Sequence, residues 1–160
     1  MKKLHLIPFQ SVGSICFNDT KEDIINKLGG LKGISRDGKC LYSEYYLIKM
    51  NDRGTIYSLC PDDPENCEIL YEGLNLNALD YKQIIKELFR KKHEIYGDFS
   101  SSPMYIDKNI GVGFVTHESD IGEDFELEAL EIASQEAMPD FNDKTLCPDD
   151  ILITREDQII

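Results

Sequence analysis

The stretch TKEDIINKLGG, residues 20–30, predicts a short helix with a signal at each end. Thr20 can accept a hydrogen bond from the first turn, and Asp23 three residues later completes a capping box. The apolar residues between them recur at helical spacing and form one stripe: Ile24, Ile25 and Leu28. The glycine pair 29–30 permits the left-handed turn that commonly ends a helix.

The same apolar pattern, Ile-Ile-x-x-Leu, returns sixty residues later in DYKQIIKELFRKKH, residues 80–93. Asp80 is the expected N-terminal cap of this second helix, and Glu87 can pair with Lys91 one turn further on. Basic residues follow at the C-terminal end, where the helix dipole favours positive charge. The sequence therefore predicts two similar helices sixty residues apart.

Strand-like sequence follows each helix. The expected strands are residues 40–50, 54–60 and 67–73, and a hairpin spans residues 104–117. These segments are rich in Tyr, Ile, Leu and Val and are separated by turn signals. The predicted fold is α+β, antiparallel and mostly β, with two main helices.

The repeated order of elements indicates a duplicated β-α-β-β-β unit within a single domain of residues 1–160. The expected halves are residues 13–73 and 74–133, and a C-terminal extension covers residues 134–160. A chain of this length can form one compact domain with a substantial core.

The segment HESDIGEDFELEALE, residues 117–131, carries seven carboxylates and no Lys or Arg. The whole chain has a formal net charge of −13, of which residues 118–160 contribute −12. The negative electrostatic potential of this charge repels nucleic acids and anionic membranes, and it attracts basic proteins from a distance. We therefore expect a basic protein partner, with no nucleic acid and no membrane.

The stretch FELEALEI, residues 125–132, has the composition of a helix and the alternation of a strand. Its alignment with residues 67–73 in the sixty-residue repeat favours a strand. Phe125 and Leu127 would then face the core, whereas Glu126 and Glu128 would face water. The remaining carboxylates are expected on the loop that leads into this strand: Glu118, Asp120, Glu123 and Asp124.

No pattern of catalytic or metal-binding residues stands out. The three histidines lack metal-ligand spacing, and His117 beside Glu118 is the best candidate for a general base. The five cysteines do not have the paired spacing of a zinc site. We expect no enzymatic activity, no metal and no cofactor. The N-terminus lacks a secretion signal and the chain lacks a long apolar run, so we expect a cytoplasmic protein.

The stretch PFQSVGSICFNDTKEDIINKLG, residues 8–29, resembles a pattern in small bacterial immunity proteins. In that pattern a Gly-x-Ile-x-Phe strand leads into a Thr-capped helix that ends in Leu-Gly, and Tyr-rich strands follow. The matching residues here are Gly13, Ile15, Phe17, Thr20, Leu28 and Gly29. The chain departs from the pattern at Asn18, where Gly is common. Proteins of this kind neutralise polymorphic or contact-dependent growth inhibition toxins.

The resemblance and the charge together predict a non-enzymatic immunity protein that neutralises a basic toxin domain, most simply a nuclease. The expected partner-binding residues are Glu118, Asp120, Glu123, Asp124, Phe125, Glu126 and Glu128, with Tyr105 as a second aromatic anchor beside Phe125. Two other functions stay open. One is a small-molecule-binding domain or small enzyme with a pocket between the two halves, and the other is an interaction module without a toxin partner.

The first testable prediction concerns metal. Because no ligand spacing is present, chelation with EDTA should leave the thermal melting temperature unchanged within error. A melting curve with and without EDTA measures this, and a large downward shift in EDTA would contradict it.

Overall fold

The computed structural model describes residues 1–119 and 124–160. The first half of the chain contains β1 (Lys2–Ile7), β2 (Ser11–Val12), β3 (Ile15–Cys16), α1 (Lys21–Leu28), β4 (Gly33–Ile34), β5 (Cys40–Tyr42), β6 (Tyr46–Met50) and β7 (Ile56–Pro61). The second half contains β8 (Cys67–Tyr71), β9 (Leu74–Asn75), α2 (Tyr81–Arg90), β10 (Ile95–Asp98), β11 (Met104–Asp107), β12 (Val112–Glu118), β13 (Phe125–Ala133), β14 (Asp150–Leu152) and the 3-10 turn η1 (Glu156–Gln158). This mostly antiparallel α+β architecture confirms the predicted fold class.

Helix α1 forms as its sequence predicts. Thr20 accepts a hydrogen bond from the backbone of Asp23, and the Asp23 side chain accepts one from the backbone of Thr20. Gly29 ends the helix with φ 70°, a conformation that costs a residue without Cβ very little. The capping box and the glycine stop are therefore confirmed.

Helix α2 forms at the predicted place but with different polar contacts. Asp80 makes no side-chain capping hydrogen bond. Glu87 pairs with Arg90 at 2.8 Å, whereas Lys91 pairs with Glu72 at 3.1 Å, so the predicted Glu87–Lys91 pair is wrong. No helix among the described residues is long and apolar enough to cross a membrane.

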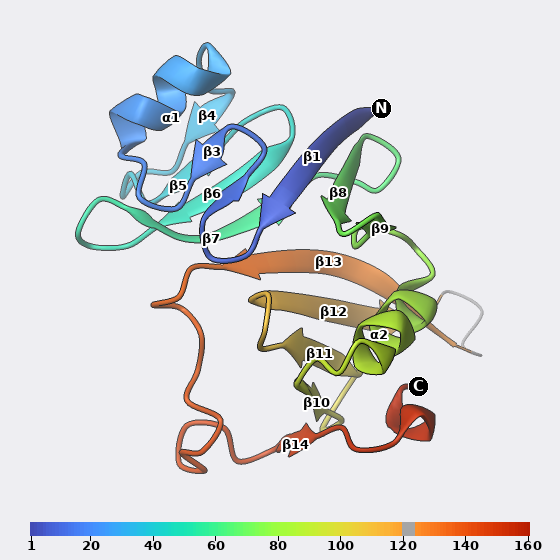
Figure 1. Ribbon diagram of the computed structural model, residues 1–160. Coiled ribbons are helices and arrows are strands. Elements are labelled where there is room, and N and C mark those ends of the chain that lie inside the picture. The colour runs from blue at the N-terminus through green and yellow to red at the C-terminus, as the bar shows by residue number, and fades with distance from the viewer. Residues whose placement is uncertain (120–123) are drawn as a thin grey trace.

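The strands form two sheets (Figure 1). The smaller sheet has the order β3-β2-β1-β8-β9, and the larger has the order β14-β10-β11-β12-β13-β7-β6-β5-β4. Strands β1 and β8 pair in parallel, and all other described strand pairs are antiparallel. Figure 1 shows α1 at the β3–β4 end of the molecule and α2 beside β10–β13.

In each sheet the strand order is symmetric about one junction, except that β3 and β14 have no counterpart. In the smaller sheet the β1–β2 hairpin meets the β8–β9 hairpin, and in the larger sheet the run β4–β7 meets the run β10–β13. Each hairpin precedes a helix and each run of four strands follows one. This order favours the duplication hypothesis with a boundary before β8, a few residues ahead of the predicted boundary at 73–74. The duplication itself stays a prediction.

The sixty-residue alignment chose the wrong counterpart for β13. It matched β13 with β8, yet β8 lies in the smaller sheet and β13 lies in the larger one. The symmetric counterpart of β13 is β7, with which it pairs. The predicted strand at residues 125–132 is nevertheless present, because alternating apolar residues specify a half-buried strand without help from the repeat.

Both sheets and both helices share one apolar core. Directly opposite residues of β11, β12 and β13 contribute Tyr105, Phe114 and Leu130, and α2 contributes Ile85 and other residues. We call this face of the larger sheet the inner face. The opposite side, on which Ile106, Gly113 and Glu131 are aligned across the same strands, is the outer face.

Tyr105 is fully buried in this core, with an exposed fraction of 0%. Its hydroxyl accepts a hydrogen bond from the backbone N–H of Ile160 at 2.7 Å and donates one to the Ile160 carbonyl at 3.1 Å. The hydroxyl of Tyr81 also donates to that carbonyl, at 2.9 Å. The prediction of Tyr105 as a surface anchor is therefore wrong, because an inward position on a central strand buries its side chain.

Replacing Tyr105 with Phe should lower the free energy of unfolding by about 1–2 kcal/mol, because the Ile160 N–H loses its partner in a half-buried site. Urea denaturation measures the change. The control is Tyr42→Phe at a 45% exposed position, which should stay within about 0.5 kcal/mol of wild type. Equal losses in the two variants would contradict the assigned role of Tyr105.

Candidate functional site

The acidic strand β13 contains a bulge that decides which side chains face outward. The register of β12 against β13 changes between Val115, opposite Ala129, and Thr116, opposite Leu127, so Glu128 has no opposite residue. In a regular strand Leu127 and Leu130 would face opposite sides because they are three positions apart. The extra residue lets both side chains enter the core.

The bulge leaves Glu126 and Glu128 exposed on the outer side of the strand. Glu126 lies opposite His117, and its Oε2 atom is 3.9 Å from His117 Nε2. Among the described residues, neither Glu126 nor Glu128 has an ion pair with Lys or Arg. Their predicted exposure on one face is confirmed.

Other carboxylates of the acidic segment are neutralised by residues from distant parts of the chain. Asp124 pairs with Lys82 of α2 at 2.6 Å, and this contact holds the pKa of Asp124 below its usual value. Glu131 lies 3.5 Å from Lys49, whose pKa it raises. The excess charge of the C-terminal quarter is therefore partly compensated in the folded protein, although no local sequence neighbour compensates it.

The predicted partner-binding residues are divided between two places. Glu118 lies opposite Phe125, which packs against the main core, so this pair belongs to the helix-bearing side of the strand. Asp124 is on that side as well, through its contact with α2. Asp120 and Glu123 lie outside the described residues. The structure thus places Glu126 and Glu128 on one side of the strand and Glu118, Asp124 and Phe125 on the other.

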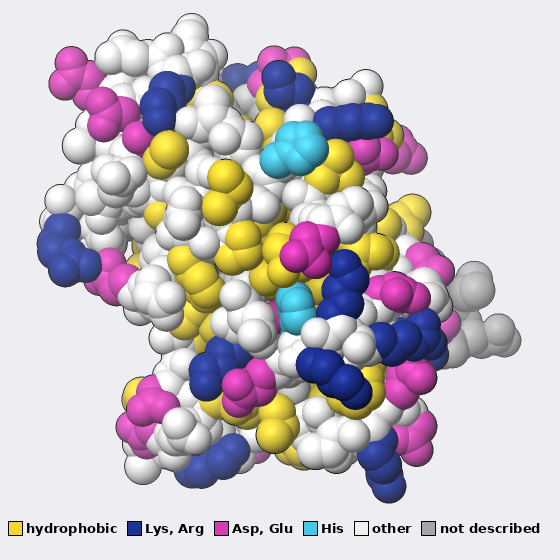
Figure 2. Space-filling view, viewed as in Figure 1, with side chains coloured by type: hydrophobic (Ala, Val, Ile, Leu, Met, Phe, Trp, Pro, Cys, Tyr) yellow, Lys and Arg dark blue, Asp and Glu magenta, His cyan; other side chains and the backbone are white. Residues whose placement is uncertain are grey.

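The helix-bearing side has mixed charge. Figure 2 shows Lys and Arg side chains gathered over α2, with Asp and Glu side chains between them. The ion pairs of Arg90 with Glu87 and Glu156 belong to this surface. A surface of alternating charge does not attract a basic partner in the way that a run of carboxylates does. The outer glutamates are therefore the better candidate for a charged interface.

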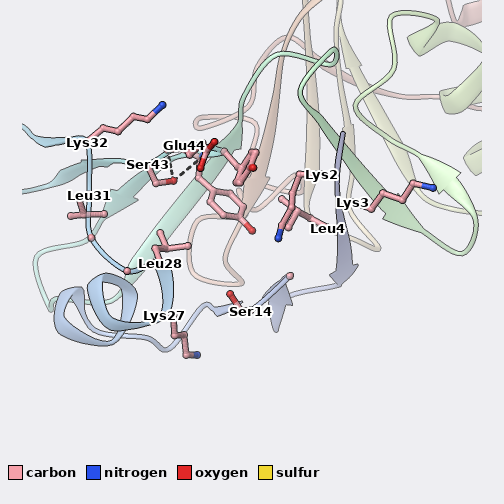
Figure 3. A pocket seen from close by; sticks show the side chains of 15 residues that line it. Lys2, Lys3, Leu4, Ser14, Lys27, Leu28, Leu31, Lys32, Ser43 and Glu44 are labelled. Carbon is pink, nitrogen blue, oxygen red and sulfur yellow. Dashed lines mark hydrogen bonds between the residues drawn. The ribbon is translucent and has the colours of Figure 1, made fainter.

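A hollow of about 580 Å³ lies between β1, the end of α1 and the β5–β6 connection. Its lining includes four lysines and one glutamate: Lys2, Lys3, Lys27, Lys32 and Glu44. Figure 3 shows the lysine side chains pointing in different directions. Lys27 is bound to Asp19 at 2.8 Å, and Lys2 lies 5.7 Å from the ring centre of Tyr45. The amines do not converge on one point, so they do not form a built anion site.

A buried His–Asp pair joins the end of α2 to β11. His93 Nδ1 lies 2.6 Å from Asp107 Oδ2, and the two side chains are 11% and 1% exposed. Asp107 Oδ1 also accepts a hydrogen bond from the Asn109 backbone. Burial raises the pKa of Asp107, and His93 opposes that effect.

This pair could orient a catalytic histidine, but the described hydrogen bonds give His93 no Ser, Thr or Cys partner. We therefore assign it a structural role. His93 is the last residue of the helix predicted over residues 80–93, and its pairing with Asp107 was not predicted. The usable signal was Asp107, which follows Tyr105 at the strand period and so occupies an inward position that requires a polar partner. Among the described residues there is no cluster of three metal-ligating side chains.

No family model matches the chain, and no curated protein or solved structure is significantly similar to it. The resemblance of residues 8–29 therefore rests on the motif residues themselves. These residues have folding roles: Gly13 has φ 60°, and a Cβ there would lie 2.8 Å from Leu4 Cδ2. Thr20 caps α1 and Gly29 ends it. The motif explains the local fold and leaves the binding surface to be found elsewhere.

Replacing His93 with Ala should lower the free energy of unfolding by about 3 kcal/mol near neutral pH, because it leaves the Asp107 carboxylate buried without its partner. The loss of His93 raises the folded-state pKa of Asp107 further. Stability of the variant should then fall as pH rises from about 4, the unfolded pKa, through the folded pKa. The deficit should therefore be smaller at pH 4 than at pH 7.

Urea denaturation of both proteins at the two pH values measures this effect. The control is His117→Ala, which removes an exposed histidine and should change stability by less than about 0.5 kcal/mol. A His93 variant with wild-type stability, or a deficit that grows toward pH 4, would contradict the role given to the pair.

Proposed function

We propose that this chain is an immunity protein that binds and neutralises a basic toxin domain through the outer side of β13. The observation that carries the proposal is the exposed pair Glu126 and Glu128, which has no Lys or Arg ion-pair partner among the described residues. The N-terminal motif supports the same class of protein by resemblance. The expected setting is the bacterial cytoplasm.

The strand holds these carboxylates in fixed positions. Leu127, Leu130 and Ile132 are buried on the inner side, with exposed fractions of 7%, 1% and 0%. A partner therefore does not have to order the backbone that presents the glutamates, and this lowers the entropic cost of association. Rigid presentation distinguishes β13 from a disordered acidic tail.

The chemistry of the pair suits a nuclease partner. A nuclease site must be electropositive to hold phosphate, and carboxylates on a rigid strand can occupy such a site in place of phosphate. The net charge of −13 also steers a basic partner toward the protein, which can raise the association rate constant to ~10⁸ M⁻¹s⁻¹ or more at low salt. Charge thus supplies fast binding and excludes acidic partners.

The test is a titration against the toxin domain encoded beside this chain's gene, at two salt concentrations. For Glu126→Gln with Glu128→Gln, association should be slower and less dependent on salt than for wild type. Each desolvated contact that is lost should cost about 2–5 kcal/mol of binding free energy, mainly through the cation left unpaired on the partner. Stability of the free variant should be unchanged or slightly higher.

A matched control separates the local effect from net charge. Glu22→Gln with Glu65→Gln removes two exposed carboxylates elsewhere and changes the net charge by the same amount. This control should bind nearly as tightly as wild type. The proposed interface is refuted if the β13 variant and the control lose binding equally, or if neither loses it.

A further inference from the structure

The outer face of the larger sheet is covered only in part. Both helices bury their apolar residues in the main core on the inner side. On the outer side a second, smaller apolar cluster forms where residues 134–149 cross β10 and β11. Phe141 stacks on Tyr96 with ring centres 4.0 Å apart and an interplanar angle of 5°. This stack holds the middle of the crossing segment against the sheet.

An apolar hollow remains between this segment and the strands. Its volume is about 170 Å³. Most of the residues that line it are apolar or small, and they include Met104, Ile106, Gly113, Val115 and Met138. An engineered apolar cavity of about 150 Å³ binds benzene. The hollow therefore has room for one leucine or phenylalanine side chain.

Carboxylates lie along the same face beside the hollow. Glu131 is part of the lining, and its contact with Lys49 is a half-exposed pair 3.5 Å long, which water screens strongly. Glu128 and Glu126 follow beyond Ala129 on the outer side of the same strand. The face thus combines one apolar depression with a row of negative charge.

We propose that this hollow receives an apolar side chain from a basic partner surface, whose Lys or Arg side chains contact Glu131, Glu128 and Glu126. Charge complementarity indicates the kind of occupant. An apolar residue flanked by cations could fill the apolar hollow while the cations contact the glutamates beside it. In this proposal the anchor is a side chain of the partner, and the hollow receives it. The sequence had predicted Tyr105 of this protein as an anchor. This inference rests on the proposed function for the identity of the partner, a toxin domain.

Buried apolar anchors at the centre of an interface contribute most of the affinity, and the charged border contributes mainly speed and selectivity. The two parts of the face should therefore respond differently to mutation. Changes at Glu126 and Glu128 should slow association, whereas a change that fills the hollow should speed dissociation.

Gly113 allows the hollow to be filled from within. A Cβ atom at Gly113 would meet its nearest neighbours at 3.8–4.0 Å, an ordinary contact distance, and its φ angle is not in the left-handed region. Gly113→Leu should therefore fold, with a melting temperature equal to or above that of wild type, because glycine weakens a strand interior. Gly33→Leu is the matched control: Gly33 lies on β4 of the same sheet, and a Cβ there would meet its nearest neighbour, Tyr42 Cδ2, at 3.7 Å, also an ordinary contact distance.

The first probe is a short peptide with one phenylalanine between lysines, titrated into isotope-labelled protein by NMR. It should shift the resonances of Met104, Ile106 and Val115 in wild type and in Gly33→Leu, and leave them unchanged in Gly113→Leu. A peptide with alanine in place of phenylalanine should bind more weakly. The second probe is the toxin domain, for which Gly113→Leu should reduce affinity by at least about 30-fold.

The outcomes distinguish the two proposals. If the peptide does not reach the hollow, or if Gly113→Leu binds either probe as wild type does, the inference is overturned. If the peptide occupies the hollow and the toxin domain does not bind wild-type protein, the proposed function is wrong and the hollow still stands as a site for basic segments with an apolar anchor.

Discussion

The nine-stranded sheet is continuous because Ile132 and Ala133 of β13 pair with Leu59 and Ser58 of β7. Within the larger sheet these two residue pairs are the only ones among the described residues that join β4–β7 to β10–β13. Leu59 and Ile132 are 1% and 0% exposed, so the junction is sealed by the core that both sheets share. Everything that the outer face presents, including the glutamates and the hollow, depends on β13 being held at this point.

The bulge in β13 determines which side chains of the strand face the core and which face the surface. From the junction backward along the strand, Ile132 and Leu130 alternate normally into the core, and the bulge then restores Leu127 to the same side. Without it the N-terminal part of the strand would turn Leu127 to water and Glu126 to the core, at a high desolvation cost. The position of the exposed carboxylates is therefore a consequence of core packing.

Local sequence predicted the elements well, because capping residues and periodicity act over a few positions. Thr20, Asp23 and Gly29 were enough to define α1. The bulge escaped prediction because Leu127 and Leu130 are three positions apart, a spacing that fits one face of a helix and not one face of a regular strand. The ion pair of Lys82 with Asp124 escaped because its partners are 42 residues apart, and charge totals for segments contain no such information. Tyr105 was misplaced because an aromatic residue on an alternating strand suits a core as well as an interface.

The two junctions also set how this protein must fold. Leu4 pairs with Ile69, and Leu59 pairs with Ile132, partners that are 65 and 73 residues apart in the chain. Closing such long loops costs conformational entropy before the strand contacts form and offset that cost. Strand pairings of this kind therefore form slowly. The strand β13 is complete only after most of the chain has been synthesised, and until then β7 exposes an unpaired edge. Such an edge can pair with another chain. Aggregation is therefore most favoured while only the first half of the chain has been synthesised. At that stage two molecules can also exchange halves.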